Sequence, residues 1–226
     1  GMVYLVPTYN NPRGYCIPPR RCEALVALAR KHNLLLFCDD VYNLLHFDPD
    51  TVAPPRLLAY DKPSDSDYQG NVISNSSFSK ILSPGLRLGW IEAGMPIVKK
   101  LVGSNILWSA GSSNHYTSEM VASALELNLQ QDYLKELNAE YREIVAKVLD
   151  IMDNGLPSTV KYNRPKGGYF IWIELPEGKK SLQIIQECMK EHKVKALPGA
   201  MCSASGSSEN CIRISFSHYP PDRLYD

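Results

Sequence analysis

Apolar residues recur along the first forty positions with two different periods. Met2–Val6 is a short apolar run that ends at a proline, which predicts a strand. Over residues 19–32 the apolar positions lie three or four apart, the spacing of one helical face. Leu34–Cys38 is a continuous apolar run, typical of a strand buried on both faces of a sheet. Strand, helix and strand at this spacing predict a βαβ unit and a parallel sheet.

The rest of the pattern predicts further strands and helices and then a segment of different character. A loop at 48–70, rich in proline, aspartate and serine, is expected on the surface. After residue 153 the pattern becomes that of an α+β segment, so we predict two domains, 1–153 and 154–226. The elements predicted beyond residue 40 are strands at 72–74 and 88–93, helices at 96–107, 116–129 and 131–153, a strand at 169–175, a helix at 181–192 and a strand at 211–216.

Composition excludes several classes of protein. Lys plus Arg equals Asp plus Glu, at 24 each, so no bulk charge attracts nucleic acid or an anionic membrane. The longest apolar runs are of strand length, which argues against a transmembrane helix. The six cysteines form no C-x-x-C pair and the histidines have no partner at ligand spacing, so we expect no metal site. Unpaired cysteines also favour a reducing, cytoplasmic location.

Polar side chains follow three of the predicted strands. Asn11 comes after the first, Asp39 and Tyr42 after the second, and Lys80 after the strand at 72–74. Ligands of α/β sheets bind beyond the carboxyl ends of the strands. A single carboxylate there, Asp39 or its neighbour Asp40, is more often a helix cap. The convergence of an amide, a carboxylate with a phenol, and an amine favours a site.

The stretch NSSFSKILSPGLRLGW, residues 75–90, has three possible interpretations. It is a solvated loop, a serine nucleophile with a lysine base, or a cradle for an anionic cofactor held by Lys80. Ser77-x-x-Lys80 matches the S-x-x-K signature of acyl-transferring enzymes, but the S-D-N and K-T-G elements that accompany it are absent. Arg213, on the last predicted strand, is either a strand-edge ion pair or an anion clamp.

Five motifs in order resemble those of one enzyme family. The chain resembles the fold-type I pyridoxal-phosphate (PLP) enzymes, specifically class I/II aminotransferases of the group acting on aromatic amino acids, kynurenine and 2-aminoadipate. The resemblance implies an α/β PLP-transferase large domain, in part, with a mostly parallel sheet and flanking helices, and a smaller α+β C-terminal domain. The motifs are Asn11–Gly14, Asp39–Tyr42, Ser77–Lys80 with Arg87, Pro165–Phe170 and Ile212–Phe216.

The resemblance also implies roles for individual residues and selects the cofactor cradle. Lys80 would form the internal aldimine and later remove the substrate Cα proton, because an amine condenses reversibly with an aldehyde. Asp39 would pair with the pyridine nitrogen and keep the ring an electron sink. Tyr42 and Asn11 would bind the ring oxygen, and Ser77, Ser79 and Arg87 would bind the phosphate. Arg213, with Asn11, would bind the substrate carboxylate.

The implied reaction moves an amino group between an amino acid and a 2-oxo acid, in a homodimer. A PLP-dependent lyase on the same scaffold, or a catalytically inactive homologue, stays open. Asn10 and Arg13 replace the glutamine and small hydroxyl residue frequent in the family. The chain begins just before the Asn-Pro motif and stops at Asp226, inside the family's last helix. We therefore expect a C-terminal fragment that binds PLP weakly and transaminates poorly.

Overall fold

A computed structural model describes residues 1–108 and 114–217, and its contacts divide the chain into two compact units. The predicted end inside a last helix, at Asp226, lies outside the described residues. Unit 1 consists of Gly1–Thr8, Cys16–His46 and Asp50–Asn138, and unit 2 of Tyr9–Tyr15, Phe47–Pro49 and Ala139–Asp226. The two are described separately below.

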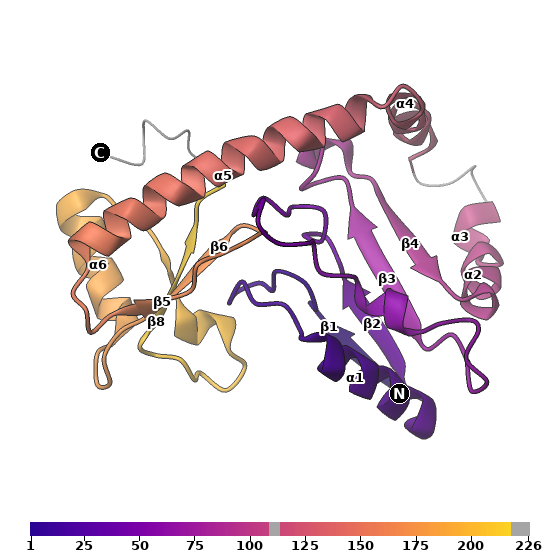
Figure 1. Ribbon diagram of the computed structural model, residues 1–226, viewed down its shortest axis with the longest axis horizontal. Helices are drawn as coiled ribbons and strands as arrows, with labels where there is room; N and C mark the ends of the chain where they lie inside the picture. Colours follow the sequence, from indigo (N-terminus) through magenta and orange to yellow (C-terminus); the bar gives the residue numbers. More distant parts are fainter. Residues whose placement is uncertain (109–113, 218–226) are drawn as a thin grey trace. The chain divides into compact units, whose positions relative to one another are not determined.

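Unit 1 contains a four-stranded sheet in the order β1-β2-β3-β4 (Figure 1). The first three strands are parallel, and β4 is antiparallel to β3. The predicted α/β class with a mostly parallel sheet is confirmed. The strands are β1 (Met2–Leu5), β2 (Leu35–Asp39), β3 (Val72–Ser77) and β4 (Gly89–Ala93).

The helix α1 (Pro19–His32) packs its predicted apolar face against this sheet. Proline at its first position loses no hydrogen bond there, and Asn33 ends the helix in the left-handed conformation. The result is one continuous apolar core over β2 and β3. Its buried members are Cys22, Val26, Ala29, Leu36, Cys38, Leu57 and Val72.

The predicted helix at 96–107 is two helices. α2 (Met95–Val102) ends at Gly103, and α3 (Asn105–Trp108) begins after it. Glycine is a poor helix former because it loses the most backbone freedom on folding. The next two helices are α4 (His115–Glu126) and α5 (Leu129–Gly155), separated by Asn128 at a φ of 58°.

The loop at 48–70 is not wholly a surface loop, which corrects the prediction. It forms a 3-10 turn, η1 (Leu57–Tyr60), and buries both Leu57 and Asp61. The carboxylate of Asp61 accepts hydrogen bonds from the Val72 backbone N–H at 3.2 Å and from an Arg30 Nη2 at 2.8 Å. Arg30, whose side chain is 8% exposed, also pairs with Asp65 and Asp67. Charge therefore ties this loop to the end of α1.

Replacing Arg30 by methionine is expected to lower the free energy of unfolding by about 3–5 kcal/mol, because Asp61 would be left buried without its cation. Arg21→Met, an exposed arginine on the same helix, is the matched control and should change it by under about 0.5 kcal/mol. Urea denaturation of both variants measures the difference. Equal effects of the two substitutions would contradict the buried-pair account.

Unit 2 is built on an antiparallel sheet in the order β5-β6-β8-β7. The two-residue strands β5 and β7 were not predicted. The helix α6 (Ser181–His192) matches the predicted bounds. In the core of unit 2, the buried rings of Phe47, Tyr141 and Phe216 contact one another edge to face. The strands are β5 (Lys161–Tyr162), β6 (Phe170–Glu174), β7 (Leu197–Pro198) and β8 (Cys211–Ser215), with a 3-10 turn η3 at Gly199–Cys202.

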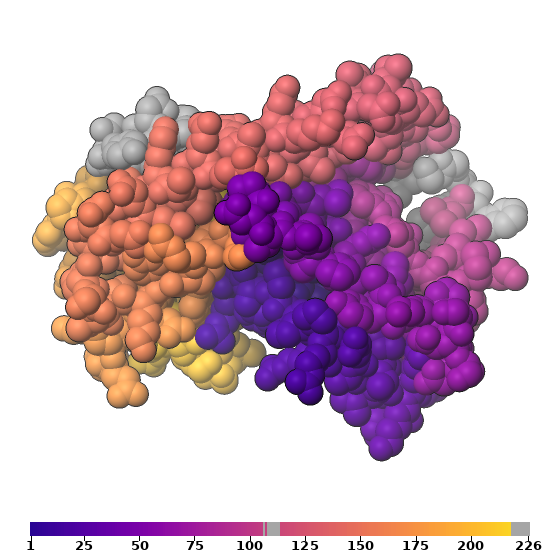
Figure 2. All heavy atoms as spheres, viewed as in Figure 1, coloured from indigo at the N-terminus to yellow at the C-terminus, as the bar shows by residue number. Residues whose placement is uncertain are grey.

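The long helix α5 contributes residues to both units. Side chains of its unit 1 portion are visible on the surface shown in Figure 2, where Leu129 and Tyr133 are exposed. Ile151, in its unit 2 portion, is exposed as well. The contact units divide the chain within α5, between Asn138 and Ala139. A functional domain boundary at residue 153 stays a prediction. Among the described residues, no helix is both long and apolar enough to cross a membrane.

Candidate functional site

Two neighbouring parallel strands of unit 1 end with residues that the sequence singled out. Asp39 is the last residue of β2 and lies opposite Asn75, while Ser77 is the last residue of β3. Tyr42 follows in the turn after β2 and is buried, with 6% of its surface exposed. Since both strands run the same way, a carboxylate, a phenol and a hydroxyl are delivered to one edge of the sheet.

The turn after β3 brings the predicted phosphate ligands together. The Ser79 backbone N–H donates to Ser77 Oγ at 3.1 Å, and Arg87 Nη1 donates to Ser79 Oγ at 3.5 Å. Lys80 lies in this turn, half-buried. Hydroxyl groups and a guanidinium in one turn are the donors that a phosphate group binds.

Arg87 is held in an unfavourable backbone conformation. Its backbone φ is 51°, a left-handed value that residues other than glycine rarely adopt. Two contacts support it: Arg87 Nη1 donates to the Pro84 carbonyl at 3.0 Å, and Asn114 Nδ2 donates to the Leu86 carbonyl at 2.8 Å. The loop is thus fixed in a shape that directs the guanidinium back toward Ser79.

One residue of this site was missed by the sequence analysis. Tyr4 Oη, on β1, donates to Asp39 Oδ2 at 2.6 Å, and the Tyr4 ring stacks on Phe37 at 6.1 Å between centroids. A tyrosine in an apolar strand has no motif of its own. The parallel register sets Tyr4 opposite Phe37 on the neighbouring strand, and the sequence carries no signal for that pairing. Tyr4 therefore helps to orient the carboxylate of Asp39.

Partial burial of the phenol oxygen and, second, its hydrogen bond to Asp39 raise the pKa of Tyr4 to about 12. Because the unfolded-state value is about 10, the phenol stabilises the fold below about pH 10, and this contribution disappears between about pH 10 and 12. In Asp39→Asn we expect a lower pKa for Tyr4. Carbon-13 NMR of labelled tyrosine, assigned with Tyr4→Phe, measures it, and an unchanged midpoint would refute the Asp39 contact.

In unit 2, the structure brings Arg213 and Asn11 together. Arg213 Nη1, on β8, donates to Asn11 Oδ1 at 2.7 Å. The guanidinium carbon lies 4.5 Å from the centroid of the Phe170 ring, on β6, a contact that favours a planar cation. Among the described residues, Arg213 is thus positioned by one amide and one aromatic ring and forms no ion pair with a carboxylate, which argues against the strand-edge ion pair.

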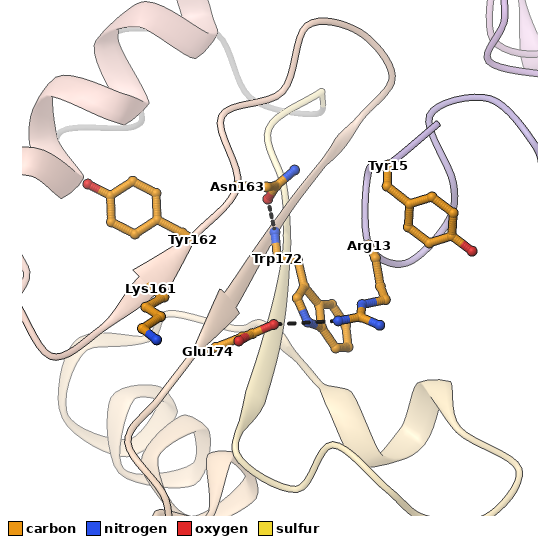
Figure 3. A pocket seen from close by; sticks show the side chains of 7 residues that line it. All are labelled: Arg13, Tyr15, Lys161, Tyr162, Asn163, Trp172 and Glu174. Carbon is orange, nitrogen blue, oxygen red and sulfur yellow. Dashed lines mark hydrogen bonds and ion pairs between the residues drawn. The ribbon is translucent and has the colours of Figure 1, made fainter. Parts of the chain in front are cut away.

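Unit 2 also contains a hollow of about 480 Å³, lined by Arg13, Tyr15, Lys161, Tyr162, Asn163, Trp172 and Glu174 (Figure 3). Arg13, two residues beyond Asn11, extends toward Glu174 and pairs with it at 3.5 Å. The Arg13 guanidinium carbon is also 5.9 Å from the ring centroid of Trp172, which lies opposite Arg213 in the sheet. Asn163 accepts a hydrogen bond from the Trp172 backbone N–H at 2.6 Å. The unusual Arg13 therefore lines a mixed aromatic and charged surface.

Comparison with known proteins decides the family. Residues 2–224 match the model of the family "Aminotransferase class I and II". The chain belongs to this family.

The relatives of this aminotransferase-family chain include proteins named as aminotransferases and proteins named as transcriptional regulators. It is 30% identical, over 100% of its length and 54% of the relative's, to an uncharacterized aminotransferase of Saccharolobus solfataricus. It is 31% identical, over 94% of its length and 43% of the relative's, to the uncharacterized HTH-type transcriptional regulator YjiR of Escherichia coli. The chain thus spans about half the length of the curated relatives it matches.

A solved structure gives the same result. The α-aminoadipate aminotransferase LysN of Thermus thermophilus, complexed with N-(5'-phosphopyridoxyl)-L-leucine, superimposes with a TM-score of 0.84 at 29% identity. The match covers 98% of this chain and 55% of LysN. The fold of this aminotransferase-family chain is therefore that of the PLP-transferases.

Proposed function

We propose that the chain is the lysine-bearing part of a PLP-dependent aminotransferase, which exchanges an amino group between an amino acid and a 2-oxo acid. The observation that carries the proposal is the turn after β3, which contains Lys80 and in which Ser77, Ser79 and Arg87 are linked by hydrogen bonds. Next to it, β2 ends in Asp39.

These residues fit the chemistry of PLP in kind and in position along the sheet. When bound, PLP supplies an electron sink for negative charge that develops at the substrate Cα. Lys80 Nζ would hold the cofactor covalently and then move a proton at that carbon. Asp39 would bind the pyridine N–H, and Tyr42 the ring oxygen with Asn11. The hydroxyl groups of Ser77 and Ser79, with the Arg87 guanidinium, would hold the phosphate.

Arg213 would bind the α-carboxylate of the substrate. A guanidinium presents two parallel N–H groups to a carboxylate, which orients the substrate as well as binding it. The amide of Asn11 and the ring of Phe170 already fix its direction. The side chain of the amino acid is proposed to be aromatic or like that of 2-aminoadipate, in keeping with the LysN similarity.

Further parts of the proposal concern the whole protein. We propose a homodimer with a cytoplasmic location, and a division into a large domain through residue 153 and a small domain after it. A second candidate function is a ligand-binding domain without turnover, which the similarity to the regulator YjiR favours. A PLP-dependent lyase would use the same cradle.

Transfer of a nitrogen label separates these candidates. Because weak PLP binding and slow transamination are expected of this chain, it is tested at high concentration with excess PLP, ¹⁵N-labelled 2-aminoadipate or phenylalanine, and 2-oxoglutarate. A slow formation of ¹⁵N-glutamate is expected, detected by mass spectrometry, while Lys80→Ala yields none. Release of labelled ammonia or of carbon dioxide would identify a lyase. Bound PLP without any label transfer would identify the silent domain.

A further inference from the structure

A second carboxyl group directly follows Asp39 but is buried in the interior of unit 1. Asp40 is 0% exposed, and its Oδ2 accepts a hydrogen bond from Ser74 Oγ on β3 at 2.6 Å. Its backbone N–H donates to the Asn75 carbonyl at 2.8 Å, and its own carbonyl accepts from the Asn43 N–H at 3.2 Å. Asp40 therefore fastens the end of β2 to β3 and holds the turn that carries Tyr42.

The Ser74 hydroxyl connects Asp40 to a charged pair. Arg56 Nη1 donates to Ser74 Oγ at 3.2 Å, and Arg56 Nη2 donates to Glu92 Oε2 at 2.9 Å. Trp90 Nε1 donates to Glu92 Oε1 at 2.9 Å. One chain of hydrogen bonds thus runs from β4, through the residue that precedes η1, to the end of β2.

The cation of this network, Arg56, pairs with Glu92 and reaches Asp40 through the Ser74 hydroxyl. The hydrogen bond to Arg56 lowers the pKa of Glu92, and the same contact raises the pKa of Arg56, so these two neutralise each other. Burial raises the pKa of Asp40. A second charge beside Asp39 is therefore disfavoured, and Asp39 is the carboxylate presented at the edge of the sheet.

We propose that Asp40 is the positioning residue of Asp39. Its buried carboxyl group, held by Ser74 and the Arg56–Glu92 pair, fixes the direction in which Asp39 and Tyr42 leave β2. What Asp39 would bind rests on the proposed function. The hydrogen bond that Tyr4 donates to Asp39 is a property of the protein alone. Asp40 itself touches neither substrate nor cofactor in this role.

The test compares Asp40→Ala and Asp40→Asn with Asp61→Asn, another buried aspartate of unit 1, whose carboxylate accepts from the Val72 N–H at the start of β3. Without cofactor, the pKa of Tyr4 is expected to fall below its value of about 12 in Asp40→Ala, because Asp39 moves away from the Tyr4 phenol. The pKa of Tyr4 should be unchanged in Asp61→Asn, because that substitution alters only the stability of the fold. Asp40→Asn, which keeps an uncharged acceptor of the same shape for Ser74, should leave it within about half a unit. If Asp40→Ala does not fold, Ser74→Ala removes the same contact.

With PLP bound, Asp40→Ala is expected to lower kcat roughly tenfold or more, with KM changed less than about twofold, since a displaced Asp39 weakens transition-state rather than ground-state interactions. The pH at which the visible absorbance of the cofactor changes should also shift. A Tyr4 pKa and an absorbance midpoint that are unchanged in Asp40→Ala overturn this inference, even where the melting temperature falls. Failure of the wild-type chain to bind PLP through Lys80 overturns the proposed function instead, while the Tyr4 measurement still decides the position of Asp39.

Discussion

Asp39→Asn is expected to lower kcat by roughly 10²–10³-fold, the usual cost of removing one preorganised electrostatic contact. A neutral amide cannot keep the pyridine nitrogen protonated, so the bound cofactor would stabilise negative charge at the substrate Cα poorly. The position of Asp39 supports this effect, because it ends β2 and its Oδ2 is already oriented by Tyr4. Asparagine keeps the shape of the side chain, so the loss should reflect charge and not folding.

Steady-state kinetics and the absorbance of bound PLP together measure this effect. The variant should still take up the cofactor through Lys80 and show its visible band. Asp132→Asn, an exposed aspartate on α5 of the same unit, is the control and should behave as the wild type. Near-normal turnover of Asp39→Asn would show that Asp40, or neither carboxylate, pairs with the ring.

Arg213→Lys is expected to lower kcat/KM by about 10- to 150-fold, which corresponds to the roughly 1.5–3 kcal/mol of one hydrogen bond to a charged group. Lysine keeps the charge but offers a point donor in place of the parallel N–H groups that match a carboxylate. It would also lose the planar contact with Phe170 and the hydrogen bond to Asn11. The KM for the amino acid should therefore rise.

The matched control is Arg164→Lys, an exposed arginine of unit 2 that pairs with Asp153. It should leave kcat/KM within about twofold of the wild type. Decarboxylated amines lack the carboxylate that Arg213 would bind. Their kcat/KM should therefore be nearly the same for the Arg213 variant and the wild type. Equal losses for amines and amino acids would assign Arg213 a structural role instead.

The sequence was sufficient for the elements whose period is long and whose ends carry clear stop signals. The bounds of α1 follow from Pro19 and Asn33, and the order of five motifs, from Asn11–Gly14 to Ile212–Phe216, was enough to identify the family. Period alone could not divide the helix at 96–107, because Gly103 interrupts it without changing its apolar spacing. The strands β5 and β7, of two residues each, are too short to have a period.

Contacts distant along the chain were beyond the sequence. Tyr4 and Asp39 are 35 residues apart, and Arg56 and Glu92 are 36 apart. The first pair meets because the parallel register places β1 beside β2. The second meets because Arg56, in the loop before η1, contacts Ser74 of β3, and the antiparallel register sets Ser74 opposite Glu92 of β4. A residue pattern predicts strands but not which polar side chains their pairing brings together. For the same reason the burial of Asp61, in a loop of polar composition, was not foreseen.

The most direct test of the cofactor site is the identity of the lysine that holds PLP. The chain is incubated with saturating PLP and reduced with borohydride, which makes the bond to the amine permanent, and its peptides are then mapped by mass spectrometry. The account predicts a pyridoxyl group on Lys80, lost in Lys80→Ala and weakened in Arg87→Met, in which the guanidinium beside Ser79 is removed. A label spread over surface lysines, and equally abundant in Lys80→Ala, would contradict it.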